Sequence, residues 1–389
     1  MRRTLGTFFI ALFIAAGAHA QNTDESLDIF GYFQNSYEHQ LDSDIGDEER
    51  TFMLQQLNLF FQQDISPQWR AFVNFEFINS FASQRQWGTA NLEEAWVRYR
   101  PNHYLNLKLG LQIPIFNNLN EIKNRTPLLP YVIRPIMYET SFSQFIDVTI
   151  AVPYRTFVQA YGFAPIGRAK LDYAAYLGNS PNINSDVTIG TTGRDTSTTF
   201  LVGGRFGVRY RELKAGVSGT FDRVNEATIT RDRQPGIVPE DAKIYQLDRV
   251  RFGADLSYRV GPVVWESEIV FVDYENPEES IGTDSEFMYG TLGLQATDRL
   301  FVYGSGWLTE FNGIVAFPNQ IVIGIVAEDN SASLDVASIG AAYTINDRVV
   351  IKGQIAEVEV SGKSHRGTEK VETFNTTFEY IATAVSVRF

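Results

Sequence analysis

Hydrophobic and polar residues alternate one by one along most of this chain. The pattern is clearest in 69–78, 105–112 and 249–258, where every second residue is apolar. Successive side chains of a β-strand point to opposite faces, so this alternation predicts strands with one apolar face each. A water-soluble β-sandwich shows the same alternation. The connections between the strands must therefore decide between the two architectures.

The connections fall into two classes by length. Seven tight turns rich in Asp, Asn, Pro or Gly separate alternating runs at 64–68, 101–103, 164–168, 210–212, 259–262, 297–299 and 345–348. Eight longer connections lie between these hairpins, at 39–51, 79–91, 113–156, 179–199, 223–244, 275–286, 312–332 and 361–374. Residues 147–152 could form a further strand, but strand parity assigns them to the third long connection.

The seven hairpins and one strand at each end predict sixteen antiparallel strands, with fourteen or eighteen as the neighbouring possibilities. Short turns at one end, long loops at the other and an even strand number are typical of a bacterial outer-membrane β-barrel. We therefore predict an all-β fold, a transmembrane antiparallel β-barrel with short periplasmic turns and long extracellular loops.

The N-terminus has the features of a secretory signal peptide. Arg2 and Arg3 precede an apolar run over 5–18, and Ala18-His19-Ala20 supplies the small residues of a cleavage site. We assign residues 1–20 to the signal peptide and 21–389 to a single barrel domain; an N-terminal membrane anchor is the alternative. The mature chain has no apolar run of 18 or more residues, which excludes a transmembrane helix.

The C-terminus alternates up to a final aromatic residue. Phe389, Val387, Val385 and Ile381 are apolar at positions 1, 3, 5 and 9 counted from the end. This pattern resembles the signal that the outer-membrane barrel assembly machinery recognises, so we expect that machinery to be a partner. A soluble edge strand that happens to end in Phe is the alternative.

Composition removes several classes of protein. The 389 residues include no cysteine, which excludes disulfides, Cys-ligated metals and thiol chemistry. The net charge of −13 argues against nucleic acid as a partner. We predict no cofactor and no metal site.

Assigning the less apolar face of each strand to the lumen places charged side chains inside the barrel. The cations are Arg70, Arg98, Lys108, Arg205, Arg209, Lys214, Arg249, Arg251 and Lys352, and the acids are Glu76, Glu94, Asp255, Glu266 and Glu268. The predicted pore wall is therefore basic, although the whole chain is acidic. Arg and Glu that pair across a polar interior, without forming an anion path, are the alternative.

The longest connection, 113–156, is too apolar for a solvated surface loop. We predict that it folds into the barrel and narrows the lumen, because opposed charges at a narrow point filter solutes by size and sign. Its candidate constriction residues are Glu121, Lys123, Arg125, Arg134 and Glu139. Alternatively, the loop covers a neighbouring subunit.

Three short stretches resemble a known family: 31–34 (GYFQ), 94–99 (EAWVRY) and 107–116 (LKLGLQIPIF), followed by Arg134-Pro135 in the long connection. Together they look like the phosphate-selective porin O/P family. The resemblance implies a sixteen-stranded trimeric porin that lets small anions diffuse through a water-filled pore narrowed by its third loop. The family's arginine ladder has possible counterparts in Arg205, Arg209, Arg249 and Arg251. Its lysine-rich constriction is missing, because Lys123 is the only lysine in the long connection.

We therefore expect a homotrimeric outer-membrane porin, surrounded by lipid and lipopolysaccharide, that passes small solutes and ions with weak anion preference, phosphate among them. A substrate-specific passive channel for a sugar or an organic acid is the alternative. Trp87, Trp96 and Trp307 would then form a stacking path; otherwise they belong to the aromatic belt at the membrane interface. An outer-membrane barrel enzyme is a remote alternative that we do not expect. His39 and His365 are predicted in loops at one end of the barrel and His103 in a tight turn at the other, so no catalytic His pair is expected, and no Gly-x-Ser-x-Gly motif occurs.

Overall fold

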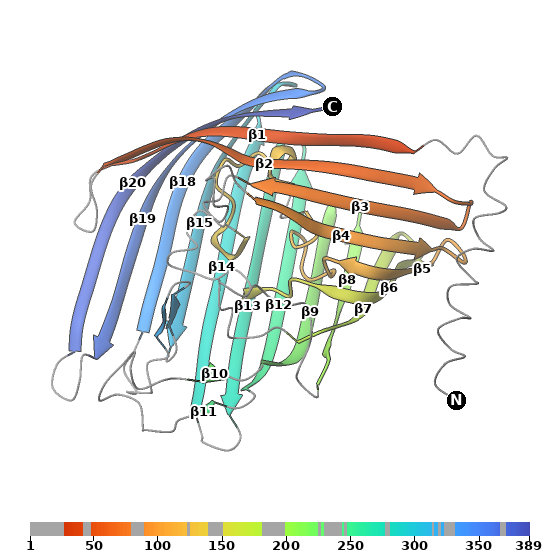
Figure 1. Ribbon diagram of the computed structural model, residues 1–389. Coiled ribbons are helices and arrows are strands. Elements are labelled where there is room, and N and C mark those ends of the chain that lie inside the picture. Colours follow the sequence, from red (N-terminus) through yellow and green to blue (C-terminus); the bar gives the residue numbers. More distant parts are fainter. Residues whose placement is uncertain are drawn as a thin grey trace.

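The computed structural model describes residues 27–41, 48–78, 89–122, 125–138, 151–180, 199–224, 227–228, 243–244, 247–276, 281–312, 315–317, 320–322, 331–365 and 371–389. Within these residues, sixteen strands form a closed antiparallel barrel, in which β20 pairs with β1 (Figure 1). No helix among them is long and apolar enough to cross a membrane. The closed ring of sixteen antiparallel strands is the fold of a transmembrane β-barrel.

The barrel strands follow one another around the ring in chain order. They are β1 (Asp28–Gln40), β2 (Glu49–Asp64), β3 (Trp69–Ile78), β4 (Thr89–Tyr99), β5 (Leu105–Gln112), β6 (Thr156–Ile166), β7 (Ala169–Gly178), β8 (Leu201–Tyr210), β9 (Leu213–Val224), β12 (Leu247–Val260), β13 (Val263–Asn276), β14 (Ile281–Gln295), β15 (Leu300–Asn312), β18 (Ser331–Asn346), β19 (Val349–His365) and β20 (Val371–Arg388).

Tight hairpins join these strands at one end of the barrel. Gly167 and Gly261 adopt φ values of 59° and 56°, and Arg211 adopts 52°. Two-residue hairpins require this left-handed backbone, which glycine adopts without steric cost. All seven predicted turns and the predicted number of strands are confirmed.

Several predicted connections are too long, because the strands continue into them. β14 begins at Ile281 and β19 extends to His365, inside the connections predicted at 275–286 and 361–374. Two small hairpins lie in the connections predicted at 223–244 and 312–332. They are formed by β10 (Ala227–Thr228) with β11 (Lys243–Ile244), and by β16 (Val315–Phe317) with β17 (Gln320–Val322). The predicted signal peptide, residues 1–20, lies outside the described residues.

The wall of the barrel is uneven in height. Strands β3 to β9 contain 8–12 residues each, whereas β12 to β20 contain 13–18 in the barrel. Figure 1 shows the long strands, in cyan to blue, beside the shorter orange and green ones. We refer to these two parts as the short wall and the tall wall.

The outer face of the barrel is apolar on both walls. On this outer face, large hydrophobic side chains are exposed in the single chain. The residues before and after each of them in the strand point into the barrel. Examples of the exposed side chains are Leu109, Val202, Phe206, Phe252, Leu308 and Ile355. An apolar outer band of this kind matches the hydrocarbon of a bilayer.

Candidate functional site: the loop and charged side chains inside the barrel

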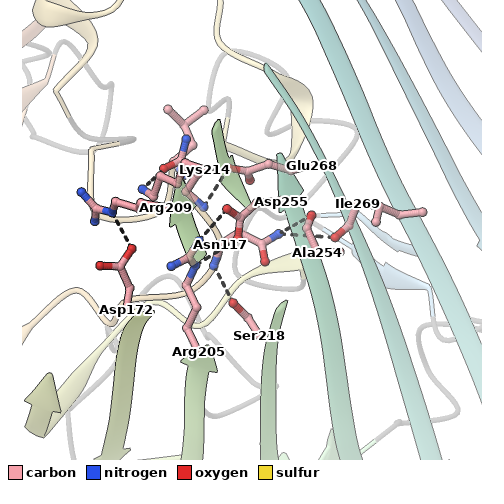
Figure 2. A network of polar contacts seen from close by, with 12 residues as sticks. Asn117, Asp172, Arg205, Arg209, Lys214, Ser218, Ala254, Asp255, Glu268 and Ile269 are labelled. Carbon is pink, nitrogen blue, oxygen red and sulfur yellow. Dashed lines mark hydrogen bonds and ion pairs between the residues drawn. The ribbon is translucent and has the colours of Figure 1, made fainter. Parts of the chain in front are cut away.

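The connection between β5 and β6 turns into the barrel directly after β5, which confirms the predicted infolded loop. Asn117 adopts a left-handed φ of 50°, and its backbone N–H donates to Ser218 Oγ on β9 at 2.8 Å. Its side-chain amide donates to the backbone oxygens of Ala254 (3.5 Å) and Ile269 (3.3 Å) on β12 and β13 (Figure 2). Gly253 permits this approach, because a Cβ there would lie 2.3 Å from Asn117 Oδ1.

Glu268 on β13 holds two parts of the loop at once. One carboxylate oxygen accepts hydrogen bonds from the backbone N–H groups of Asn118 (3.0 Å) and Leu119 (2.7 Å). The other accepts a hydrogen bond from the Tyr138 hydroxyl at 2.5 Å. Burial and the neighbouring Glu268 carboxylate raise the pKa of Tyr138 well above its usual value, so this hydroxyl stays protonated and keeps donating.

A second anchor fixes the middle of the loop to the opposite side of the ring. Gln354 Oε1 on β19 accepts hydrogen bonds from the backbone N–H groups of Val132 (3.0 Å) and Ile133 (2.9 Å). Gln55 on β2 donates to the Val132 carbonyl at 2.9 Å, and Lys352 donates to Gln34 at 2.7 Å and to the Tyr131 carbonyl at 3.4 Å. The loop therefore crosses the lumen from β9, β12 and β13 to β19 and β2.

Apolar loop side chains pack on the inner face of the tall wall, which is itself apolar. One buried cluster joins Phe116, Leu119, Tyr131, Ile133 and Met137 of the loop to wall residues of β13 to β20. The wall members are Val270, Val272, Phe287, Tyr289, Tyr303, Trp307, Phe311, Leu334, Val336, Ala356, Val358, Val360, Phe378, Tyr380, Ala382 and Ala384. This half of the interior is therefore a packed core.

Trp307 belongs to this core, so both predictions for it, a stacking path for solutes and a place in the interface belt, are wrong. Its side chain is 0% exposed and points inward, and its indole N–H donates to Ser305 Oγ at 2.7 Å. It is therefore neither part of an interface belt nor available to stack on a solute. Trp87 lies outside the described residues.

The space left by the loop lies against the short wall. A cavity of about 170 Å³ is enclosed between loop residues 115–121 and strands β6 to β9. Arg205, Arg209 and Lys214 project into this region from neighbouring strands, around Asn117 (Figure 2). Glu121 lines the same cavity from the loop.

Two of these cations already have acidic partners. Arg205 forms a buried bidentate pair with Asp255 on β12, at 3.0 and 2.6 Å. Gly216 on the intervening strand lets this pair form, because a Cβ there would lie 2.3 Å from Arg205 Nη2. Arg209 donates through Nε to Asp172, and the Arg209 side chain is still 52% exposed.

Three more of the predicted wall arginines are also paired with aspartates. Arg249 donates to both oxygens of Asp222, at 2.7 and 2.5 Å, and Arg251 reaches the same carboxylate at 3.4 Å. Arg70 is paired with Asp64 at 2.5 and 2.8 Å. Sequence reasoning missed Asp64, Asp172 and Asp222. The register of the strands contained the signal, because Asp222 lies directly opposite Arg249 and Asp64 directly opposite Arg70.

Arg98 and Lys108 differ from these arginines. They lie opposite one another on β4 and β5, and Arg98 is also opposite Arg70 on β3, so the three cations form a row. The Lys108 amino group lies 4.6 Å from the Trp96 ring centroid and 5.3 Å from that of Tyr161. Trp96 faces inward and stacks on Phe72. Trp96 is therefore not part of an aromatic belt at the membrane interface.

The predicted constriction residues separate into three groups. Glu121 lines the cavity, as described above. Arg125 and the buried Arg134 lie within electrostatic range of Tyr32 on β1 and do not line that cavity. Lys123 and Glu139 lie outside the described residues.

The C-terminal residues predicted as an assembly signal lie on the outer face of β20 or at its end. Phe389 and Gly31 exchange two backbone hydrogen bonds of 3.0 Å, which extend the seam between β20 and β1. Val385 is exposed outward, and Val387 and Ile381 are half-buried at alternate positions on the same face. Gly31 is required here, because a Cβ would lie 2.4 Å from the backbone oxygen of Asn58 and 2.8 Å from the Phe389 ring.

Comparison with known proteins agrees with this architecture. No protein-family model and no curated protein match the chain. Among solved structures, the anion-selective porin from Comamonas acidovorans is similar, with 12% identity, a TM-score of 0.59 and coverage of 94% of this chain and 100% of that one. The outer membrane channel DcaP of Acinetobacter baumannii has 10% identity, a TM-score of 0.59 and coverage of 94% and 97%.

OmpT, an outer membrane protein of Vibrio cholerae, is similar at 7% identity, with a TM-score of 0.58 and coverage of 95% and 100%. Because the sequence identities are so low, these similarities are evidence for the fold alone. The chain has the barrel architecture that outer-membrane porins and channels share.

Proposed function

We propose that this protein is an outer-membrane porin through which small hydrophilic solutes and ions diffuse passively. The observation that supports this most directly is a closed barrel with an apolar outer face, whose infolded loop leaves a charged cavity against one wall. The fold likeness to an anion-selective porin and to an outer-membrane channel adds support. The predicted signal peptide and C-terminal assembly signal agree with an outer-membrane location.

The conducting path lies along the short wall in this proposal. The tall wall is closed by the packed core that it forms with the loop. Charged side chains line the cavity on β7 to β9, and the partly exposed Arg70 and Arg98 lie on the neighbouring β3 and β4. Water and ions would therefore pass eccentrically, between loop residues 115–121 and the short wall.

A weak preference for anions, phosphate among them, follows from the row formed by Arg70, Arg98 and Lys108. Cations placed directly opposite one another repel, and an anion passing over them relieves that repulsion. The preference is weak because Arg70, Arg205, Arg209, Arg249 and Arg251 are all paired with aspartates.

The short wall also favours contact with another subunit, and the assembly that we propose is a homotrimer. β5 has eight residues, which rise roughly 27 Å along the strand. At the usual tilt this is about 20 Å along the membrane normal, less than the roughly 25 Å apolar band of outer-membrane barrels. Contact with another subunit at this wall would remove the mismatch with the bilayer.

An outer-membrane enzyme is not proposed. His39 contacts Glu48 and Arg50 at the long-loop end of β1, and His103 lies beside Arg100 in a tight turn at the other end. A substrate-specific passive channel is the second candidate, which the small size of the cavity favours.

Single-channel recording in a planar bilayer under a KCl gradient tests the proposal. We expect steady conductance that closes in three equal steps, and a reversal potential of anionic sign. Swelling of proteoliposomes in small sugars should accompany it. Protein that shows the heat-modifiable mobility of a folded barrel but neither conducts nor swells liposomes would contradict the proposal.

A further inference from the structure

The cavity against the short wall has the size of a small organic solute. Its volume of about 170 Å³ corresponds to roughly five or six water molecules at the density of the liquid. It is bounded by Ile115, Asn117 and Asn118 of the loop on one side and by Tyr161 of β6 on the other. Charged groups line it from both the loop and the wall.

Two charges of opposite sign in this cavity have no ionic partner among the described residues. The Lys214 amino group donates to the side-chain carbonyl of Asn118, which is neutral. Glu121 makes no hydrogen bond or ion pair with any part of the chain that the structure describes. The other charges are satisfied within the cavity wall, since Arg205 is paired with Asp255 and Arg209 with Asp172.

Glu121 and Lys214 are both partly buried, and an unpaired charge that has lost water gains from an opposite partner. A simple anion would bind Lys214 but would be repelled by Glu121. A simple cation would bind Glu121 but would be repelled by Lys214. A solute with one group of each charge satisfies both residues at once.

We propose that this cavity is a binding site for small zwitterions of the α-amino-acid class. The solute carboxylate binds the Lys214 ammonium, and the solute ammonium binds the Glu121 carboxylate. The half-exposed guanidinium of Arg209 lines the same cavity and adds a donor for the solute carboxylate. This inference rests on the proposed porin function and specifies its solute class.

Four probes of nearly the same size separate charge from shape. L-alanine is the zwitterion, L-alaninamide the cation, L-lactate the anion, and L-lactamide the neutral comparison. Each is added to open channels, and the concentration that half-reduces the ion current is measured. We expect L-alanine to act at a concentration about tenfold or more below the others, since one charged hydrogen bond is worth about that factor.

Two substitutions test the assignment of each charge. Glu121→Gln and Lys214→Met should each weaken the effect of L-alanine by about tenfold. The anion L-lactate should respond in opposite directions, acting more weakly in Lys214→Met and more strongly in Glu121→Gln. Asp298→Asn, in the exposed turn between β14 and β15, is the matched control and should change neither probe.

The outcomes separate this inference from the porin proposal. If the channel conducts but L-alanine acts no more strongly than its three relatives, the zwitterion site is wrong and the porin stands. The site is also wrong if both substitutions leave the L-alanine effect unchanged in conducting channels. If the wild-type protein does not conduct, the porin proposal fails, and calorimetric titration of L-alanine into folded protein in detergent decides the site on its own.

Discussion

Replacing Glu268 by alanine should release the start of the infolded loop from the wall. The Glu268 carboxylate accepts hydrogen bonds from the Asn118 and Leu119 backbone and from the Tyr138 hydroxyl. An unpaired buried donor costs about 1–3 kcal/mol, so three donors amount to about 3–9 kcal/mol. Removing the buried carboxylate offsets several kcal/mol of this. We take about 3 kcal/mol as the net loss, which raises the open population of the loop roughly 150-fold.

Cysteine labelling measures that population. The chain contains no cysteine, so Leu119→Cys introduces a single reactive site on the loop. Leu119 is buried, and a membrane-impermeant thiol reagent can modify a cysteine there only when the loop opens. We expect Glu268→Ala to accelerate labelling about 100-fold relative to Leu119→Cys alone.

The matched control is Glu268→Gln, which retains an oxygen acceptor for the two backbone N–H groups. Its labelling rate should rise by about 30-fold at most and stay below that of Glu268→Ala, because a neutral hydrogen bond replaces a charged one at each of the two N–H groups, at about 1 kcal/mol each. Heat-modifiable mobility checks that every variant is folded. A labelling rate in Glu268→Ala within threefold of the parent would refute the role given to this carboxylate.

Four further predictions concern the two walls and the chain end. Trp307→Ala should lower the free energy of unfolding by about 3–5 kcal/mol in thermal denaturation, whereas its outward-facing neighbour Leu308→Ala, which is 53% exposed, should change it little; equal effects would contradict the packed core. Gly216→Val should break the Arg205–Asp255 pair and cost about 3–5 kcal/mol in the same assay; wild-type stability would show that the pair tolerates a side chain there. Lys108→Gln should move the reversal potential toward cations, with Arg299→Gln in an exposed turn as the control; an unchanged potential would place Lys108 off the ion path. Removal of the Phe389 side chain by Phe389→Ala should reduce the amount of protein in the outer membrane while folding in detergent continues; normal amounts in cell fractionation would exclude an assembly role.

The strands and turns could be predicted from sequence because their signal is local. Alternation at 105–112 reports one apolar face, and the turn at Gly261 lies between two such runs. The lining of the tall wall could not be predicted in this way. In 269–272, Ile269 and Phe271 point outward while Val270 and Val272 point inward, so both faces are apolar and the alternation disappears.

The candidate site was only partly predictable for a similar reason. Sequence patterning placed Arg249 and Arg251 on the inner face, where the structure has them, but it did not show that Asp222 neutralises them. Glu121 was identified by its position in the long loop. Its neighbour across the cavity, Lys214, belongs to a strand nearly a hundred residues later, and only the loop's path through the barrel brings the two to one cavity.

The second anchor of the loop also constrains the order in which the barrel assembles. Val132 and Ile133 are held by Gln354, which follows them by 222 and 221 residues and lies on the next-to-last strand. The middle of the loop therefore gains this second anchor only when β19 has joined the sheet. Until then this hydrophobic segment lacks part of its native cover, and exposed segments of this kind are prone to aggregate. Closure of the β1–β20 seam then encloses the loop, so the last strand pairing and the narrowing of the lumen are one late event in biogenesis.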